Sequence, residues 1–136
     1  MAALTADKVV KNKALGRSVS LRVAASTTIY KGAMVIVGAD GFAIPADDAA
    51  NRSRVLGIAD HLADNSAGSD GDIRVRVLKG VFGIENNGSV VQATVGGLVY
   101  AADDQTAALT GEGTADNLIG TVDDFDDGGL VFVEIE

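Results

Sequence analysis

One stretch decides the fold of this chain: Asp72-Ile73-Arg74-Val75-Arg76-Val77-Leu78-Lys79-Gly80-Val81-Phe82-Gly83-Ile84-Glu85. Its first half alternates apolar and basic residues, the pattern of a strand with one buried face and one exposed face. At Lys79-Gly80 the pattern slips by one residue, and Phe82 and Ile84 take over the apolar positions. Because such a slip would turn the buried face outward, the sequence predicts a bulge or bend at Lys79-Gly80.

The composition describes a small chain rich in short aliphatic side chains. Of its 136 residues, 47% are hydrophobic, 4% are aromatic and none is cysteine. This length suffices for one domain with a substantial core. The lack of cysteine excludes disulfides, thiolate metal ligands and a cysteine nucleophile. With no long apolar run and no signal-peptide core near the N-terminus, we expect a soluble protein that is not exported by the usual route.

Charge is unevenly distributed along the chain, which carries −8 in total. Residues 1–31 hold six basic residues against one acidic residue, or +5, which leaves −13 for the remainder. The acidic remainder repels phosphate and argues against nucleic acid as its partner. We expect residues 1–16 to form a basic N-terminal arm, mobile or loosely held in the isolated protein, and residues 17–136 to form a single β-domain.

Short apolar segments separated by turn signals predict an all-β fold, a small β-sandwich or barrel of the jelly-roll kind. The strands expected before the central stretch are 17–23, 33–37, 42–44 and 55–59. The strands expected after it are 97–101, 107–109, 118–122 and 130–135. Residues 60–71 and 110–115 are expected to be loops.

The segments on either side of the central stretch match each other. Gly32–Ile36 aligns with Gly96–Tyr100, and Gly57–Asp64 aligns with Gly120–Asp127, at offsets of 64 and 63 residues. The match predicts two pseudo-repeated halves. The alternative is chance, since small β-proteins share a vocabulary of Gly, Val and Asp.

Residues with reactive side chains offer little chemistry. His61 is the single histidine. Zinc would need three carboxylates around it, an uncommon ligand set, and no Gly-x-Ser-x-Gly segment supports a Ser-His-Asp triad. We interpret His61 as a solvated loop residue and expect no catalytic, cofactor-binding or metal site.

The acidic segment 123–134 can be aligned with a twelve-residue calcium loop. Asp123, Asp127 and Glu134 fall at positions one, five and twelve of that loop. Phe125 stands at position three, where an oxygen ligand is required. The alternation that follows is typical of a strand, so the sequence favours an acidic hairpin turn.

Four short segments occur in order along residues 17–136, and each is ordinary strand-and-turn sequence by itself. They are Lys-Gly-x-x-Val at 31–35, Val-x-Gly-Ile-Ala at 55–59, Val-x-Val-x-x-Gly-Val-Phe from Val75 through Phe82, and Gly-x-x-Val-Tyr at 96–100. As an ordered set they are more specific. In this order the chain resembles the small capsid cement, or head decoration, proteins of tailed bacteriophages.

The resemblance implies a protein that binds the outside of an expanded icosahedral head and bridges neighbouring major capsid protein subunits, without being an enzyme. It implies a homodimer or homotrimer on a symmetry axis. The protein would be made in the host cytoplasm and would lie on the outer surface of the virion, with no cofactor and no nucleic-acid or membrane partner.

We expect the contacts to the capsid or a neighbouring subunit to come from the arm and from the basic stripe of the central strand. The residues are Lys8, Val9, Val10, Lys11, Lys13, Arg17, Arg74 and Arg76. The lysines would meet acidic side chains, while Val9 and Val10 would add strand pairing to an open sheet edge. A solvated tail without a role is the alternative.

A second class of function is a small β-domain enzyme or carbohydrate-binding module associated with a phage tail. It would need a concave pocket rich in aromatic or carboxylate side chains. The chain has two tyrosines, four phenylalanines and no tryptophan, so stacking platforms for sugars are scarce.

Overall fold

The chain is nearly all β, which confirms the predicted class. The computed structural model describes residues 3–47, 53–109, 117–126 and 128–136, and for residues 11–16 it describes the backbone alone. The strands are β1 (Lys11–Arg22), β2 (Thr27–Ile29), β3 (Met34–Val37), β4 (Ala43–Pro45), β5 (Gly57–Ala59), β6 (Ala63–Asn65), β7 (Arg74–Asn86), β8 (Leu98–Asp103), β9 (Thr106–Ala108), β10 (Asn117–Asp126) and β11 (Leu130–Ile135). A single turn of 3-10 helix, η1, spans Gln92–Thr94.

Five strands close into a small barrel, in the order β7-β9-β8-β10-β11 and back to β7. β11 pairs antiparallel with the second half of β7, from Leu130↔Glu85 to Ile135↔Gly80. β9 pairs parallel with the end of the same strand, at Glu85↔Thr106. Closure leaves none of these five strands with an open hydrogen-bonding edge around the ring.

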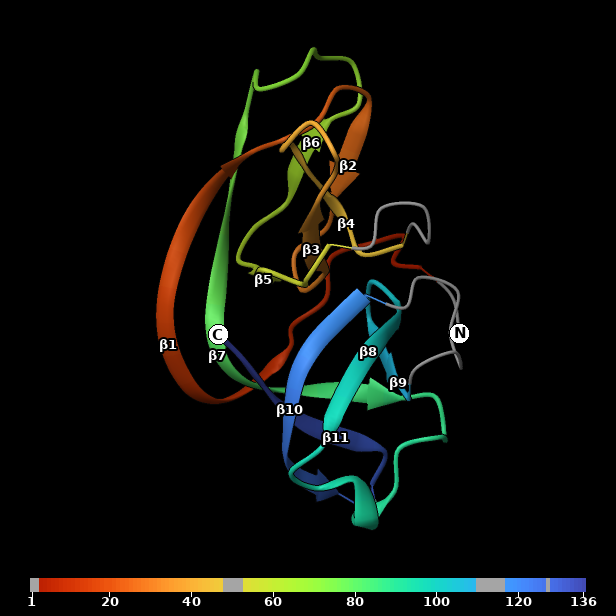
Figure 1. The fold of residues 1–136 in the computed structure, drawn as a ribbon. Helices are drawn as coiled ribbons and strands as arrows, with labels where there is room; N and C mark the ends of the chain where they lie inside the picture. The colour runs from red at the N-terminus through yellow and green to blue at the C-terminus, as the bar shows by residue number, and fades with distance from the viewer. Residues whose placement is uncertain (1–2, 48–52, 110–116, 127) are drawn as a thin grey trace.

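The first half of β7 belongs to a second layer of strands. β1 follows β7 antiparallel from Arg22↔Arg74 to Lys11↔Gly83, and the two form a long curved ribbon along one side of the molecule (Figure 1). On its other edge β7 pairs with β5, which leads to β3 and β4. The β1–β7 ribbon therefore connects the barrel to the remaining strands.

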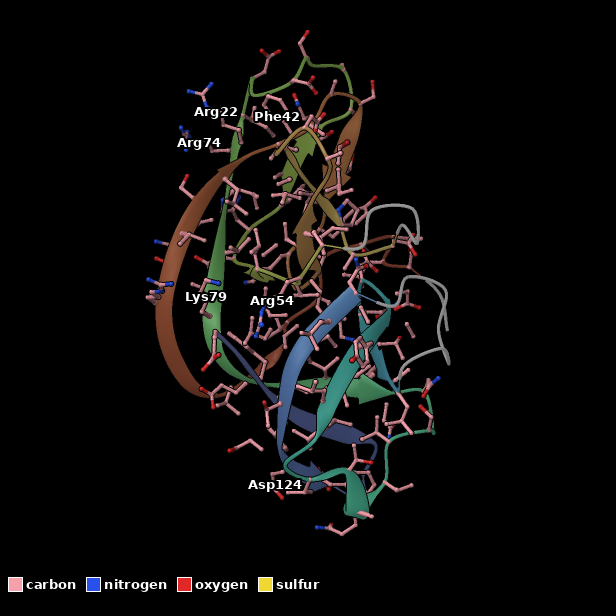
Figure 2. All side chains as sticks on the ribbon, viewed as in Figure 1. Arg22, Phe42, Arg54, Arg74, Lys79 and Asp124 are labelled. Atoms are coloured by element: carbon pink, nitrogen blue, oxygen red, sulfur yellow. The ribbon has the colours of Figure 1, made fainter. Side chains whose placement is uncertain are left out.

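The predicted bend at Lys79-Gly80 is where β7 passes from one layer to the other (Figure 2). β5 pairs with β7 as far as Leu78, and β11 begins its pairing at Gly80. Gly80 has a φ of +144°, a conformation that side chains disfavour. The extra residue sits in β1, whose register shifts between Leu15 and Ser18 opposite this point.

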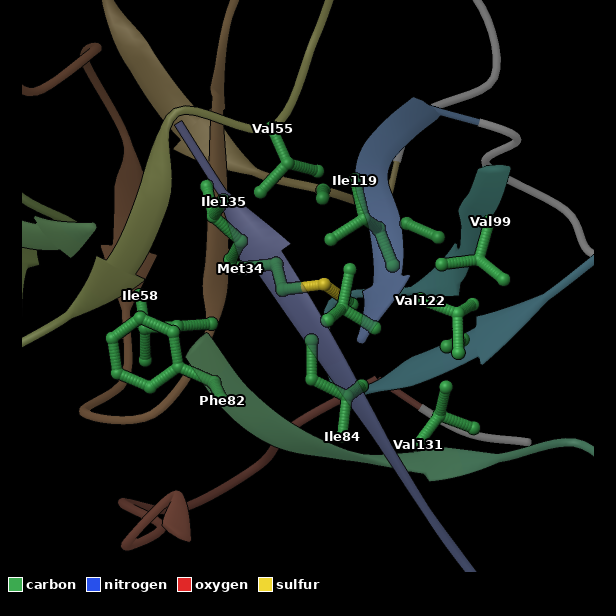
Figure 3. Packing of buried hydrophobic residues seen from close by; sticks show 14 of the residues in the cluster. Met34, Val55, Ile58, Phe82, Ile84, Val99, Ile119, Val122, Val131 and Ile135 are labelled. Atoms are coloured by element: carbon green, nitrogen blue, oxygen red, sulfur yellow. The ribbon is translucent and has the colours of Figure 1, made fainter. Parts of the chain in front are cut away.

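Two apolar cores result from this bend. Val75 and Val77 face a smaller core. Phe82 and Ile84 face the core of the barrel (Figure 3). β3 separates the two cores, because Met34 and Ile36 pack into the barrel core and Val35 into the smaller one. Burial on both faces explains why its sequence is an unbroken apolar run.

The two halves of the chain have the same strand order and the same antiparallel pairings, β4-β3-β5-β7 and β9-β8-β10-β11. Positions related by the offsets of 64 and 63 residues form equivalent cross-strand pairs. These pairs are Val35↔Gly57 with Val99↔Gly120, and Ile36↔Ile44 with Tyr100↔Ala108. The predicted pseudo-repeat is thus present in both topology and register.

Several predicted boundaries were wrong. β1 begins at Lys11, so the arm boundary at residue 16 falls inside a strand. β6 lies within the loop expected over 60–71, where it pairs with β2. The loop expected over 110–115 lies outside the described residues. No helix in the described residues is long and apolar enough to span a membrane.

Candidate interaction surface

Residues 3–10 lie along the body of the protein. The Leu4 N–H donates to Asp104 Oδ1 at 2.9 Å, and the Leu4 side chain packs against the smaller core. Further along, the Lys8 N–H donates to the Lys31 carbonyl at 2.7 Å, and the Lys31 N–H donates to Asp7 Oδ1 at 3.0 Å. The expectation of a free arm is corrected for this segment, because acceptors and donors distant in sequence hold its backbone.

The predicted contact residues of the arm fall into three groups. Lys8 Nζ lies 3.1 Å from Glu85 Oε2 and donates to Gln105 Oε1 at 3.2 Å, so its charge is used within the chain. Val9 is 82% exposed, and Val10 is half-buried against the barrel core. Lys11 and Lys13 belong to β1 by their backbone, and their side chains lie outside the described part of the chain.

Asp104, which anchors Leu4, is a buried carboxyl. Burial raises its pKa to about 6, against the lowering effect of the Leu4 N–H, and the neighbouring charges of Asp47 and Asp103 raise it further. Asp103 is buried as well, and its Oδ1 accepts from the Gln105 N–H at 3.0 Å. The sequence analysis did not single out Asp103 or Asp104, so it missed this buried pair.

The basic stripe of the central strand divides into a paired and an unpaired part. Arg76 forms an ion pair with Asp60, donating through Nε at 2.8 Å and also through Nη2. Arg74 lies directly opposite Arg22 on β1, and both side chains are exposed. Within the described residues neither Arg22 nor Arg74 has an ion-pair partner, so two like charges face each other across the ribbon.

Lys79 is a buried lysine at the bend of β7. It is 7% exposed, and its Nζ donates to a main-chain oxygen of Glu136, the last residue of the sequence, at 2.7 Å. Burial lowers the pKa of Lys79, and the nearby positive charges of Arg17 and Arg54 lower it further. The sequence contained a signal for this burial, because Lys79 continues the every-second-residue spacing of the buried Val75 and Val77.

His61 has a structural role that the loop interpretation missed. Its Nε2 accepts from the Arg76 N–H at 3.1 Å, and its Nδ1 lies 3.0 Å from the Leu62 carbonyl. This arrangement places the proton on Nδ1. β5 pairs with β7 only at Val77 and Leu78. At Arg76 the exposed imidazole of His61 accepts the hydrogen bond that a neighbouring strand would otherwise accept.

The acidic segment is mostly strand. β10 continues through Asp126, so Asp123 and Asp124 lie in the strand, and Asp126 Oδ1 accepts from the Gly128 N–H at 2.9 Å. Asp127 lies outside the described residues. In the described ranges, no group of three or more His, Asp or Glu side chains is placed to hold a metal ion.

A polar cavity of about 490 Å³ opens where the ends of β7, β9 and β11 meet. Its lining consists of Glu85, Asn86, Asn87, Gln105, Thr106, Gly128, Gly129 and Leu130. None of these residues is aromatic.

Comparison with models of protein families, with curated proteins and with solved structures finds no match to this chain. The resemblance to cement proteins therefore stays a prediction from the four ordered segments of the sequence.

Proposed function

We propose that this chain is a capsid decoration protein, which binds the outside of a tailed-phage head and stabilises the shell by bridging major capsid protein subunits. It acts by binding and carries out no reaction. It assembles as a homodimer or homotrimer and lies on the virion surface, without nucleic-acid or membrane partners.

The observation that supports this proposal best is the placement of unpaired cations in an acidic molecule. Arg17, Arg22, Arg54 and Arg74 are all exposed, and none forms an ion pair with another described residue. Three of them belong to the β1–β7 ribbon, which is held on a closed barrel. Charged side chains on paired strands lose little backbone conformational entropy when they bind a partner. This property suits a protein that must hold neighbouring capsid subunits together.

The order of the four segments gives the proposal its biological context, and the β-barrel body agrees with it. Arg17 and Arg74 are retained as proposed contacts, together with Val9 on the surface of the N-terminal segment. Arg76 and Lys8 are weaker candidates, because each already faces a carboxylate of its own chain.

A carbohydrate-binding module or small enzyme is the second candidate, favoured by the polar cavity beside β9. Amide and carboxylate side chains such as Asn86, Gln105 and Glu85 can hydrogen-bond to sugar hydroxyls. The lack of an aromatic platform in its lining counts against tight binding. Reproducible binding on a glycan array, abolished by Asn86→Ala, would favour this candidate.

Electron microscopy of the parent virion tests the main proposal. We expect density for this barrel on the outer surface of the head, at sites between capsid subunits. Its location inside the head, on the tail, or nowhere in the virion would refute the proposal.

A further inference from the structure

We propose that Val91, Val95 and Leu98, beside η1 at the end of the barrel, form a docking surface for an extended segment of a protein partner that carries apolar and basic side chains (Figure 1). This surface is the counterpart, in the second half of the chain, of the surface that holds residues 3–10 in the first half. Only the identity of the partner as a capsid subunit rests on the proposed function.

The turn before β3 and the turn before β8 have the same conformation. Gly32 and Gly96, related by the offset of 64 residues, have φ values of +90° and +88°. The Gly32 N–H donates to the Ala59 carbonyl at 2.9 Å, and the Gly96 N–H donates to the Val122 carbonyl at 2.9 Å. Ala59 and Val122 are themselves related by the offset of 63 residues. The two turns therefore present equivalent backbone surfaces.

In the first half, the N-terminal segment occupies this backbone surface. The Lys8 N–H donates to the Lys31 carbonyl at 2.7 Å, and a Cβ on Gly32 would overlap the Lys8 carbonyl oxygen. Side chains of the segment and residues of the body line a small pocket between them, among them Val9, Val10, Gly32, Ala59 and Asp60. The molecule thus shows what the turn can hold, which is an extended segment with apolar and basic side chains.

In the second half, the equivalent surface is open within the described residues. A Cβ on Gly96 would meet no atom within 4 Å, and no described N–H donates to the carbonyl of Val95, the counterpart of Lys31. Three large apolar side chains lie exposed around this turn, Val91 by 49%, Val95 by 40% and Leu98 by 52%. Covering them with an apolar segment would remove this surface from water and favour binding.

The charge beside the open turn favours a basic segment. Asp123 follows Val122 on β10 and is the counterpart of Asp60. Asp60 pairs with Arg76, whereas Asp123 is exposed and has no ion-pair partner within the described ranges. A lysine or arginine of the docked segment would be attracted to Asp123, and an acidic segment would be repelled by a chain that carries −8.

The test measures the binding of a fluorescein-labelled peptide with the sequence of residues 4–13, which combines apolar and basic side chains. Its affinity for the full-length protein is measured by fluorescence anisotropy. Leu98→Ser removes an apolar side chain from the docking surface. Leu62→Ser is the matched control, because Leu62 is 47% exposed and lies in the other half of the chain. Asp123→Asn removes the charge beside the turn, and denaturant unfolding shows that each variant is folded.

We expect Leu98→Ser to weaken binding of the peptide about tenfold and Leu62→Ser to change it by less than about twofold. Asp123→Asn should weaken binding about threefold at low salt and less at high salt, because salt screens the attraction. The absence of binding to the wild-type protein would overturn the docking surface. Equal effects of the two serine substitutions would also overturn it, because the peptide would then bind elsewhere, for example at the turn of the first half.

Sedimentation of the protein alone distinguishes a second copy from another partner. Self-association of the wild-type protein that Leu98→Ser abolishes would show that a second copy occupies the surface, and would overturn its assignment to a different protein. Co-sedimentation with purified phage heads addresses the identity of that protein. If the wild-type protein does not bind heads, the proposed function is wrong, whereas the peptide titration still decides the docking surface.

Discussion

Gly57 and Gly120 occupy equivalent positions in the two halves of the chain, each pressed against the carbonyl of a neighbouring strand. A Cβ on Gly57 would lie 2.7 Å from the Leu78 carbonyl oxygen, and a Cβ on Gly120 would overlap the Glu134 carbonyl oxygen. Leu78 pairs with Ile58 as Glu134 pairs with Thr121, so the two close approaches arise from the same register. The repeated glycines are therefore required by backbone contact.

Alanine at either glycine should destabilise the fold. We expect Gly57→Ala and Gly120→Ala each to lower the free energy of unfolding by about 2–3 kcal/mol, because a backbone carbonyl cannot move aside as a side chain can. Gly41→Asn is the control, since Gly41 has open space and a positive φ that asparagine tolerates. Denaturant titration measures all three. A cost at Gly120 no larger than that at Gly41 would contradict the contact.

Asp104 should make stability depend on pH in the direction opposite to a paired surface carboxylate. Its folded-state pKa of about 6 lies above the unfolded value of 3.8, so the folded protein binds this proton more tightly. Its contribution is fully present below about pH 4 and is lost as the pH rises through 6.

Asp104→Asn should therefore stabilise the protein by about 1–3 kcal/mol at pH 8, with little effect at pH 3.5. The asparagine Oδ1 can still accept from the Leu4 N–H. Asp104→Ala removes that acceptor and should be less stable than the asparagine variant at both pH values. Thermal unfolding from pH 3.5 to 8 measures the effect. A gain that does not shrink on acidification would argue against a raised pKa.

Removing the N-terminal segment should cost stability, contrary to the behaviour of a free arm. Deleting residues 1–10 loses the Leu4 packing and the hydrogen bonds to Asp104 and Lys31, and we expect a loss of about 2–3 kcal/mol. Lys8→Gln alone should cost less than about 1 kcal/mol, because its ion pair is partly exposed. Unfolding curves that coincide for deleted and full-length protein would show that the segment is not held in solution.

His61 should contribute to stability through the backbone of β7. We expect His61→Ala to cost about 1 kcal/mol, because the Arg76 N–H loses its acceptor and must turn to water. Asp60→Asn, which weakens the adjacent exposed ion pair, should cost less. Native-state hydrogen exchange at the Arg76 amide distinguishes the two variants. Unchanged protection of that amide in His61→Ala would contradict the proposed bond.

The sequence predicted the parts of this fold that depend on local pattern. The slip at Lys79-Gly80 was visible because alternation has a fixed period, and the switch of core faces followed from it. The pseudo-repeat was visible because both halves of the sequence have a glycine, Gly57 or Gly120, where a side chain would collide with a backbone carbonyl. Neither signal required knowledge of contacts distant in sequence.

The parts that sequence reasoning missed depend on distant partners. Residues 11–16 form strand without alternating, because β7 supplies their hydrogen bonds. Leu4 is held by Asp104, 100 residues away. The hydrogen-bond acceptor of Lys79 lies at Glu136, 57 residues away, so its partner could not be predicted from spacing alone.

Co-sedimentation with purified phage heads tests the central claim most directly. Protein is mixed with expanded heads lacking it, over a range of salt concentrations, and bound and free fractions are measured. We predict saturable binding at a fixed ratio to the capsid subunits, with affinity falling as salt rises because exposed cations carry the contacts. The absence of saturable binding at low salt, with protein shown to be folded, would contradict the account.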